Sequence, residues 1–500
     1  MRIFKNVFFV VIILSLFSKG LGFYRDILIT NYFGFGITTD ALLMAISIVT
    51  LLFSFFQTSI RTTFVPIFSQ SYRINQEKAV TDFNSLKSFI LIILIILTGF
   101  LYLNANRVAV IFAPGFDQEA ISMTTEYFHL SLILLLTYGV FYINTGFLQA
   151  IRIFSTLETA GIVNNVVIIV ILFSFSQQFG PISVIFGYII GSLFQVFISY
   201  YTLNIRTSYT FKFTLKIIKS PIIKNFINLS KYVMVGSLVT QVSVFLDKFI
   251  ASYLITGSVT ALHYANLLKT LPLTIVVLTV TNIFFPNLTV SYKEDKITFT
   301  RLIEKQLIYM SFFTLYVSVI FICLSKEIVT LLFYRGEFTM TGIEMVSSAL
   351  IAYSCGSVFW VIKEVLGKVS YAVEDTKTPM ILAINSLIIN LVLNILLSYY
   401  FGHVGIALAT SISFAINCLL LYYSLKKNIN FKIKKKTINL IISMTIVSML
   451  VIISILYLKQ LILEFSTNQI IVITTITLVI SIIYITIGKF LGLIKFSWGR

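Results

Sequence analysis

Charged residues are scarce in this chain. Asp, Glu, Lys and Arg make up 11% of its 500 positions, whereas apolar residues make up 58%. Soluble domains carry about 25% charged residues. The composition therefore excludes an ordinary soluble enzyme or binding domain and indicates an integral membrane protein with many spans.

Cysteine and histidine are scarce as well, with three residues of each. Cys323, Cys355 and Cys418 lie far apart in apolar segments, where a cysteine behaves as a small buried hydrophobe. Neither residue type indicates a disulfide framework or a metal site. No Walker loop, zinc-site spacing or nucleophile triad occurs either. We therefore expect no enzyme and no cofactor.

Long apolar runs dominate what is present. A transmembrane helix needs about 20 mostly apolar residues, and the runs predict an all-α polytopic protein with some fourteen helices. They lie at 6–30, 41–68, 88–104, 127–151, 160–176, 181–203, 230–255, 265–291, 306–325, 345–367, 380–400, 404–425, 437–458 and 469–493. The first run continues through charged positions without a cleavage site, so it predicts a retained helix and not a signal peptide.

Basic residues outnumber acidic ones by 37 to 19, and their placement favours membrane lipids over nucleic acid as a partner. With the N-terminus in the cytoplasm, the inside loops hold most of them, as the positive-inside rule requires. The inside set is Arg206, Lys212, Lys216, Lys219, Lys224, Lys231, Lys426, Lys427, Lys432, Lys434, Lys435 and Lys436. The outside set is Arg107, Lys326, Arg335 and Lys459. We expect both termini in the cytoplasm.

The chain also repeats itself at a nearly constant offset. Phe64–Tyr72 resembles Phe284–Tyr292, 220 positions later, and Tyr200–Leu203 resembles Tyr422–Leu425, 222 positions later. Each half holds six helices and starts on the same side, which indicates a parallel repeat about an axis along the membrane normal. Two lobes around a central cavity are the architecture of an alternating-access transporter.

This repeat predicts four parts. Residues 1–205 form an N-lobe with helices 1–6, and residues 206–229 form a basic cytoplasmic linker. Residues 230–425 form a C-lobe with helices 7–12. Residues 426–500 hold a basic loop and two further helices, 13 and 14, outside the duplication.

A few charged residues fall at membrane depth, where an ion is expensive and normally faces a cavity or another helix. Segment 18–42 carries Lys19, Arg25, Asp26 and Asp40. The Gly-x-Gly turn at 34–36 beside these charges is typical of a bent helix that lines a cavity. The alternative is that Arg25 and Asp26 only snorkel to the membrane interface.

The repeat offset sets Arg25–Asp26 opposite Asp247–Lys248, so the two halves would place ion pairs in one cavity. A cation-rich cavity suits an anionic substrate, above all one with phosphate. The alternative is that these ions neutralise one another and hold helices together. Lys269 and Arg61 are expected near cytoplasmic helix ends, where they snorkel. The candidate binding residues are Lys19, Arg25, Asp26, Asp40, Arg61, Asp247, Lys248 and Lys269, and we expect no metal ligand.

Several short motifs are spread along the chain. They are Ser18-x-x-Leu-Gly-Phe-x-Arg-Asp26, Phe33-Gly-x-Gly, Asp40-Ala, Phe64-Val-Pro66, Asp247-Lys-x-x-Ala-Ser-x-Leu, Gly257-Ser-Val-x-Ala-Leu-x-Tyr-Ala265, Phe333-x-Arg-Gly-x-Phe-Thr339 and Tyr371-Ala-x-x-Asp-Thr-x-Thr-Pro379. Together these motifs resemble those of the MviN/MurJ family of lipid II flippases. The resemblance covers nearly the whole chain. It implies the multidrug/oligosaccharidyl-lipid/polysaccharide exporter fold, with two six-helix lobes and two extra helices that border a groove for a lipid tail.

The resemblance also implies a function. It is that of a flippase in the bacterial cytoplasmic (inner) membrane, which moves lipid II, a polyprenyl-diphosphate-linked peptidoglycan precursor, from the inner to the outer leaflet. In the family, basic cavity residues are thought to receive the pyrophosphate and sugar head group. Arg25 and Asp40 match family positions, and Lys19 stands where an arginine is usual. Leu267 stands where the family has another arginine.

The family's second-helix arginine pair is also absent, so Arg61 or Lys269 would have to substitute for missing cations. These departures favour an alternative substrate: a lipid-linked oligosaccharide for capsule, teichoic acid or exopolysaccharide. A cation-coupled drug exporter is a further alternative, although its cavity would need carboxylates. A scaffolding protein that transports nothing is the last alternative.

The partners implied are the lipid-linked saccharide, membrane lipids and other cell-envelope synthesis proteins, with no nucleic acid. Moving one charge across the membrane involves about 2.3 kcal/mol per 100 mV. Coupling to voltage or to a monovalent counter-ion is therefore compatible with the sequence.

Overall fold

The structure is a computed structural model that describes residues 2–207, 209–214, 226, 241–375, 377–429, 431–465 and 468–493. Helices make up nearly all of these residues and no strand occurs among them, which confirms the all-α class. The chain divides into two compact units. The first comprises Met1–Thr260 with Gly336–Phe338, and the second comprises Ala261–Arg335 with Thr339–Arg500.

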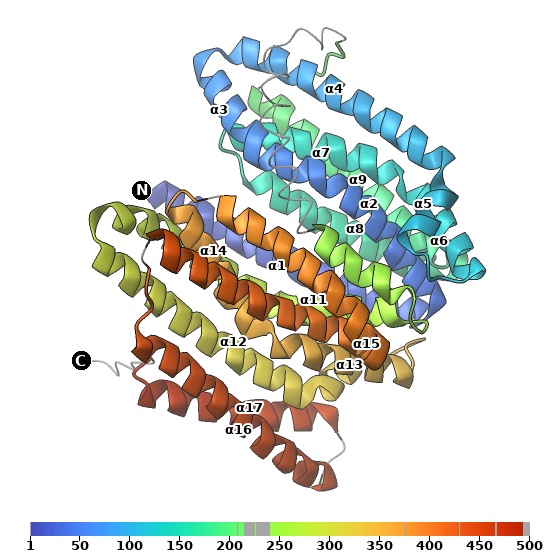
Figure 1. Cartoon of the computed structure of the whole chain (residues 1–500). Coiled ribbons are helices and arrows are strands. Elements are labelled where there is room, and N and C mark those ends of the chain that lie inside the picture. The colour runs from blue at the N-terminus through green and yellow to red at the C-terminus, as the bar shows by residue number, and fades with distance from the viewer. Residues whose placement is uncertain are drawn as a thin grey trace. The chain divides into compact units, whose positions relative to one another are not determined.

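The first unit begins with a long run of helices (Figure 1). They are α1 (Arg2–Phe33), α2 (Ile37–Ser59), the π-helix η1 (Ile60–Phe64), α3 (Val65–Ile74), α4 (Gln76–Leu103), α5 (Ala105–Phe112), α6 (Gln118–Ser131), α7 (Ile133–Ala150), α8 (Ser155–Phe179) and α9 (Ile182–Thr207). Residues 241–251 form a further helix. Aromatic stacking holds the core together: the rings of Phe64 and Phe68 are 4.2 Å apart, and those of Phe83 and Phe147 are 4.4 Å apart.

Two glycines let α9 approach α8 closely. A Cβ on Gly191 would meet Asn164 Oδ1 at 2.4 Å, and one on Gly187 would meet the Cα of Ile168 at 3.2 Å. Small residues at such contacts allow the close backbone approach on which helix association in membranes depends. This packing fixes α8, which also carries Asn165, a residue of the candidate site.

The second unit holds the remaining helices (Figure 1). They are α11 (Ser258–Glu294), whose first turn belongs to the first unit, α12 (Lys296–Phe333), α13 (Met340–Cys355), α14 (Ser357–Ala372), α15 (Lys377–Ile429), α16 (Lys435–Phe465) and α17 (Gln469–Phe490). α13 and α14 meet at a 46° bend. The two last helices pack against α12.

The apolar runs fall mainly on observed helices, and residues 230–240 are outside the described part. Three runs, 41–68, 127–151 and 345–367, cross a boundary between observed helices, and residues 252–255 lie beyond the end of the helix 241–251. Several observed helices are longer than predicted. α4 begins at Gln76 instead of residue 88, because its first turns are polar and hydropathy detects only the apolar part. Among the described residues, nine helices are long and apolar enough to span a membrane, and the bent pair would be a tenth. One of them, α15, contains two predicted spans. The count of fourteen stays a prediction.

The internal repeat is visible in the backbone at helix ends. Gly180 (φ 54°, ψ −143°) and Gly402 (φ 56°, ψ −137°) have the same unusual conformation, 222 positions apart. Arg152 and Glu374, also 222 apart, are the two described non-glycine residues with positive φ, at 69° and 66°. Asn104 and Leu324, 220 apart, interrupt their helices at φ −116° and −117°. The two halves therefore share breaks and turns as well as sequence. The predicted lobe and linker boundaries remain predictions.

Candidate functional site

Arg25 and Asp26 form a buried ion pair on α1. Arg25 Nη2 lies 2.8 Å and Nε 3.0 Å from Asp26 Oδ1. The side chains are only 16% and 10% exposed. Neither residue therefore snorkels to the surface of its unit, which was the alternative reading of the sequence.

Asn165 and Tyr188 fix the orientation of the guanidinium group. Arg25 Nη1 donates to Asn165 Oδ1 at 3.0 Å, and Asn165 Nδ2 donates to the carbonyl of Ser18 at 3.0 Å. The guanidinium carbon also lies 5.1 Å from the ring centre of Tyr188. These bonds use three of the five N–H groups of an arginine. Within the described part of the chain, the other two N–H groups make no hydrogen bond. The guanidinium fork matches the geometry of phosphate oxygens, so these two groups suit a phosphate ligand.

Lys248 adds a second cation to this unit. Its ammonium group donates to Ser47 Oγ, and its charge interacts with the carboxylates of both Asp26 and Asp40. Two cations and two anions thus form one cluster, with Arg25, Asp26 and Asp40 from the first half of the repeat and Lys248 from the second. The repeat offset predicted that the two halves place ion pairs in one cavity, and this stays a prediction.

Asp40 has a different environment from that expected of a ligand-binding residue. Its carboxylate accepts hydrogen bonds from the N–H of Gly257 (2.6 Å), the N–H of Thr260 (2.8 Å) and the hydroxyl of Thr260. It therefore caps the start of α11, where free N–H groups and the helix dipole attract a negative charge. The side chain is buried, and its acceptor capacity is largely used inside the protein.

Asp40 belongs to a larger contact region, which we call the latch: residues 31–40, 257–260 and 336–338. The N–H of Glu337 donates to the carbonyl of Asn31 at 3.2 Å. The rings of Phe35 and Phe338 lie 5.4 Å apart, edge to face. A Cβ on Gly336, whose φ is +58°, would meet the Asn31 carbonyl oxygen at 2.0 Å. The latch thus joins the α1–α2 turn to two segments from the second half of the repeat.

A cavity of about 230 Å³ borders the latch at Asp40. Its lining also includes Asp117 and Ser252. This volume admits several water molecules, because one water needs only about 10–15 Å³ of such space. Water can therefore lie beside the latch carboxylate.

The second unit contains its own pair of lysines around one aromatic ring. Lys269 is 5% exposed, and its Nζ lies 4.5 Å from the ring centre of Tyr353 and 5.6 Å from that of Phe414. Lys363 Nζ lies 5.4 Å from the Phe414 ring and 3.1 Å from Glu364 Oε1. The prediction that Lys269 snorkels is wrong, because aromatic faces hold its ammonium group inside the unit.

The other predicted site residues lie elsewhere or outside the description. Lys19 is exposed, and Asp247 is half-buried on the helix 241–251. Arg61 lies in η1, and its side chain is outside the described part of the structure. Whether any of the eight predicted residues binds substrate stays a prediction.

Sequence reasoning missed one buried lysine and one half-buried lysine. Lys459 was assigned to an outside loop, but it lies in α16, 2.8 Å from Glu327 Oε2 and 2.9 Å from the carbonyl of Cys323 on α12. Lys87 was placed outside the membrane helices, but it lies in α4 and is 3% exposed. Both flank apolar runs, so hydropathy reads them as loop residues. Asn165 and Tyr188, which contact Arg25, were also missed. They carry no charge, and nothing in the sequence around them indicates a binding site.

Two solved structures share the fold of this protein. A solved structure titled lipid II flippase MurJ, inward closed conformation, aligns with a TM-score of 0.80 at 24% identity, covering 95% of this chain and 98% of that one. An inward-facing multidrug resistance MATE family transporter of the MOP superfamily aligns with a TM-score of 0.67 at 13% identity, over 83% of this chain and 94% of that one. Both alignments extend over most of this chain, so all three proteins share one fold.

Sequence comparisons narrow the class to a family. The family model described as lipid II flippase MurJ matches residues 29–477, and the chain belongs to this family. A probable lipid II flippase MurJ of Buchnera aphidicola subsp. Acyrthosiphon pisum is 29% identical over 426 residues, covering 82% of this chain and 81% of its own. A lipid II flippase MurJ of Thermosipho africanus is 27% identical over 429 residues, covering 83% and 84%.

Proposed function

We propose that this protein flips lipid II from the inner to the outer leaflet of the bacterial cytoplasmic membrane. Membership of the MurJ family carries the proposal. Lipid II joins a saccharide head group to a polyprenyl tail through a diphosphate, so a protein that moves it needs cations at membrane depth. Both termini would lie in the cytoplasm, and the protein would act as a transporter and not as an enzyme, with no cofactor.

Arg25 is the cation best prepared for the diphosphate. Its guanidinium group lies over the ring of Tyr188 and is hydrogen-bonded to Asp26 and Asn165, so its orientation is fixed. Two of its N–H groups are not used by these bonds. Lys269 and Lys363 supply further positive charge in the second unit, where Leu267 replaces the usual family arginine. A lysine binds phosphate as a point charge, without the forked geometry of arginine. Lys269 and Lys363 would therefore tolerate variation in the head group.

The latch supports a mechanism of alternating access. Sidedness from the basic loops puts residues 31–40, 257–260 and 336–338 at the external face. With the latch closed, the external side is shut, and a substrate enters from the cytoplasmic leaflet. Release requires that the bonds of Asp40 to Gly257 and Thr260 break. Substrate binding can drive this opening only through its higher affinity for the open state.

Growth rescue tests the proposal. Cells depleted of their own lipid II flippase would receive the wild-type chain, Arg25→Ala, or Lys78→Ala, an exposed lysine on α4 as the matched control. We expect wild type and Lys78→Ala to restore growth and Arg25→Ala to fail at equal membrane levels. Failure of well-folded wild type, combined with binding of another extracted lipid-linked saccharide, would reassign the substrate. Rescue by all three would remove Arg25 from the binding site.

A further inference from the structure

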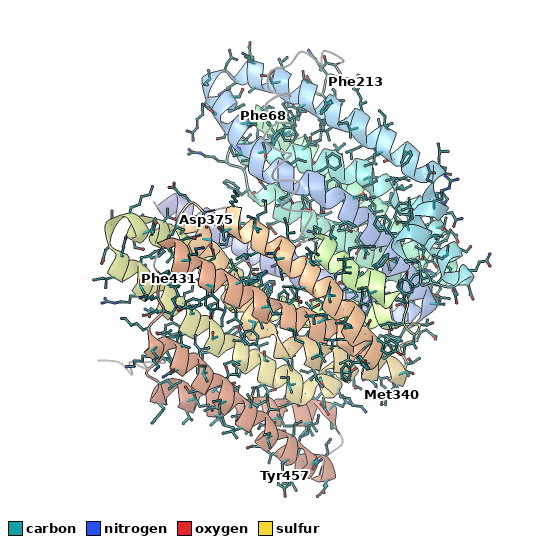
Figure 2. All side chains as sticks on the ribbon, in the orientation of Figure 1. Phe68, Phe213, Met340, Asp375, Phe431 and Tyr457 are labelled. Atoms are coloured by element: carbon teal, nitrogen blue, oxygen red, sulfur yellow. The ribbon has the colours of Figure 1, made fainter. Side chains whose placement is uncertain are left out.

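Residues 209–214, which we call the strap, follow α9 and are bonded along α4. The hydroxyl of Tyr209 donates to Asn84 Oδ1 at 2.8 Å, and the N–H of Lys212 donates to the same oxygen at 3.2 Å. Further along, the N–H of Thr214 donates to Ser88 Oγ at 3.2 Å. Tyr209 is fully buried in the aromatic core of the first unit. The strap is therefore held at both ends, and Phe213, labelled in Figure 2, is left exposed.

Lys87 lies between the two α4 residues that hold the strap. Its Nζ donates to Asn144 Oδ1 at 2.9 Å. The rings of Phe83, Tyr200, Tyr209 and Phe211 surround the ammonium group, with centres 4.7–5.9 Å away. Two of these four rings belong to the strap. A lysine at the start of an apolar run normally snorkels to water, whereas this one is enclosed by cation–π contacts.

The second unit repeats the arrangement without the lysine. The N–H of Lys434 donates to Glu304 Oε1 at 2.7 Å, and Phe431 (Figure 2) is buried in the core cluster that includes Phe299 and Ile303 of α12. These residues stand 220 or 222 positions after Asn84, Lys212 and Tyr209. The position equivalent to Lys87 is Leu307, also buried. A strap thus belongs to each half of the repeat, but only the first one is built around a cation.

We propose that the strap stays docked on α4 throughout the transport cycle, with Lys87 as the positioning residue that holds it. Undocking would expose the ring of Tyr209, remove the strap's hydrogen bonds to Asn84, and leave Lys87 with two of its four rings. A buried cation is unfavourable without such partners, so the enclosed lysine makes the docked state the stable one. The second strap leads to α16.

A disulfide between strap and helix tests whether docking is permanent. Ser88→Cys and Thr214→Cys would be introduced after Cys323, Cys355 and Cys418 are changed to alanine, because Ser88 Oγ already contacts the backbone of Thr214. We expect the disulfide to form with and without added lipid II, and flipping by the oxidised protein to equal that of the reduced protein. Loss of flipping on oxidation, restored by reductant, would overturn the proposal.

The role of Lys87 is tested separately with Lys87→Leu, which copies the residue of the second half, and Lys78→Leu as the control on the same helix. Backbone amide exchange of residues 209–214 in the purified protein gives a readout that needs no substrate. We expect Lys87→Leu to raise this exchange at least tenfold and Lys78→Leu to leave it unchanged. Unchanged exchange in Lys87→Leu would show that the lysine does not hold the strap.

Combining the two changes completes the test. If Lys87 acts only through the strap, the Lys87→Leu variant should flip lipid II at the wild-type rate once the disulfide between Ser88→Cys and Thr214→Cys has formed. A defect that persists with the disulfide formed would assign Lys87 another role and overturn the proposal. Because crosslinking and amide exchange do not depend on the substrate, a failure of lipid II transport in the wild type would refute the proposed function and leave the strap still testable.

Discussion

Arg25 shows how one residue can serve both structure and binding. Its ion pair with Asp26 is buried, and such pairs gain little net stability because both ions lose their hydration. A fold that needed only a helix contact here would be served as well by apolar side chains. The two guanidinium N–H groups that Asp26 and Asn165 do not use can bind an anion that enters the site. Anion binding is therefore a function that an apolar side chain could not supply.

Substituting Arg25 and Asp26 one at a time separates a structural role of the pair from a role in substrate binding. Arg25→Gln removes the spare donors, and because a hydrogen bond to a charged group contributes about 1.5–3 kcal/mol, we expect lipid II flipping to fall at least about tenfold. Asp26→Asn keeps an acceptor for Arg25 and is expected to cause a much smaller loss. Flipping rates in proteoliposomes at equal protein content measure both. Equal losses would mean that the pair serves structure alone.

Asp40 carries the bonds of the latch, so Asp40→Asn is expected to loosen it. The side-chain NH₂ group of asparagine cannot accept a hydrogen bond from Gly257 or Thr260. Each bond to the carboxylate that is lost in this way costs about 1.5–3 kcal/mol. Ser258→Cys, fully buried in the latch, would then react at least about tenfold faster with a membrane-impermeant maleimide. Glu337→Cys, already exposed, should react at one rate in both backgrounds. An unchanged rate at Ser258→Cys would count against a latch role for Asp40.

At the scale of elements, two glycines of similar φ offer a matched comparison. Gly336 (φ +58°) has the Asn31 carbonyl where a Cβ would lie, whereas Gly180 (φ +54°) has open space. Gly180→Ala is expected to cost only backbone strain, about 1–3 kcal/mol, and to leave the latch shut. Gly336→Ala should in addition push the latch apart and speed the external labelling of Ser258→Cys. Equal labelling in the two variants would be inconsistent with this account.

The ion pair of Lys459 and Glu327 fastens α16 to α12. Lys459 also bonds the carbonyl of Cys323, beside the helix break at Leu324. Lys459→Met leaves a buried carboxylate unpaired and should lower thermal stability, by about 3–5 kcal/mol in free energy of unfolding. The double variant Lys459→Met with Glu327→Leu should recover most of this loss. If the double variant is no more stable than the single one, the pair does not act as a unit.

The sequence predicted the helices well, because each apolar run has to cross the same thickness of lipid. It predicted less about ions at helix flanks. Lys87 and Lys459 adjoin apolar runs, and nothing in the sequence distinguishes a snorkelling lysine from one enclosed by rings or a carboxylate. The latch was also out of reach: it joins segments more than 200 residues apart, and although the motifs at Gly257 and Gly336 stood out by resemblance, their contacts depend on tertiary structure.

At the scale of the whole molecule, duplication explains both the likenesses and the differences between the halves. Helix breaks and straps recur at offsets of 220 and 222, so each half repeats one design. Some charges recur, as at Lys212 and Lys434, but others do not. Arg25, Lys87 and the latch belong to the first unit, and the lysines around Phe414 belong to the second. The shared design supports a rocking transporter, while the unshared charges are where substrate and conformational control are expected.

The amount of lipid II head group on the outer face of the cytoplasmic membrane tests the central claim most directly. It can be measured with an impermeant enzyme that cleaves exposed head groups, in spheroplasts depleted of their own flippase. The protein would carry Asn31→Cys and Glu337→Cys, whose backbones are in contact across the latch, with its native cysteines replaced. We predict head-group exposure with the latch reduced, none with it oxidised, and recovery on reduction. Exposure that persists with the disulfide formed, or that never rises above the level of depleted cells, would contradict the account.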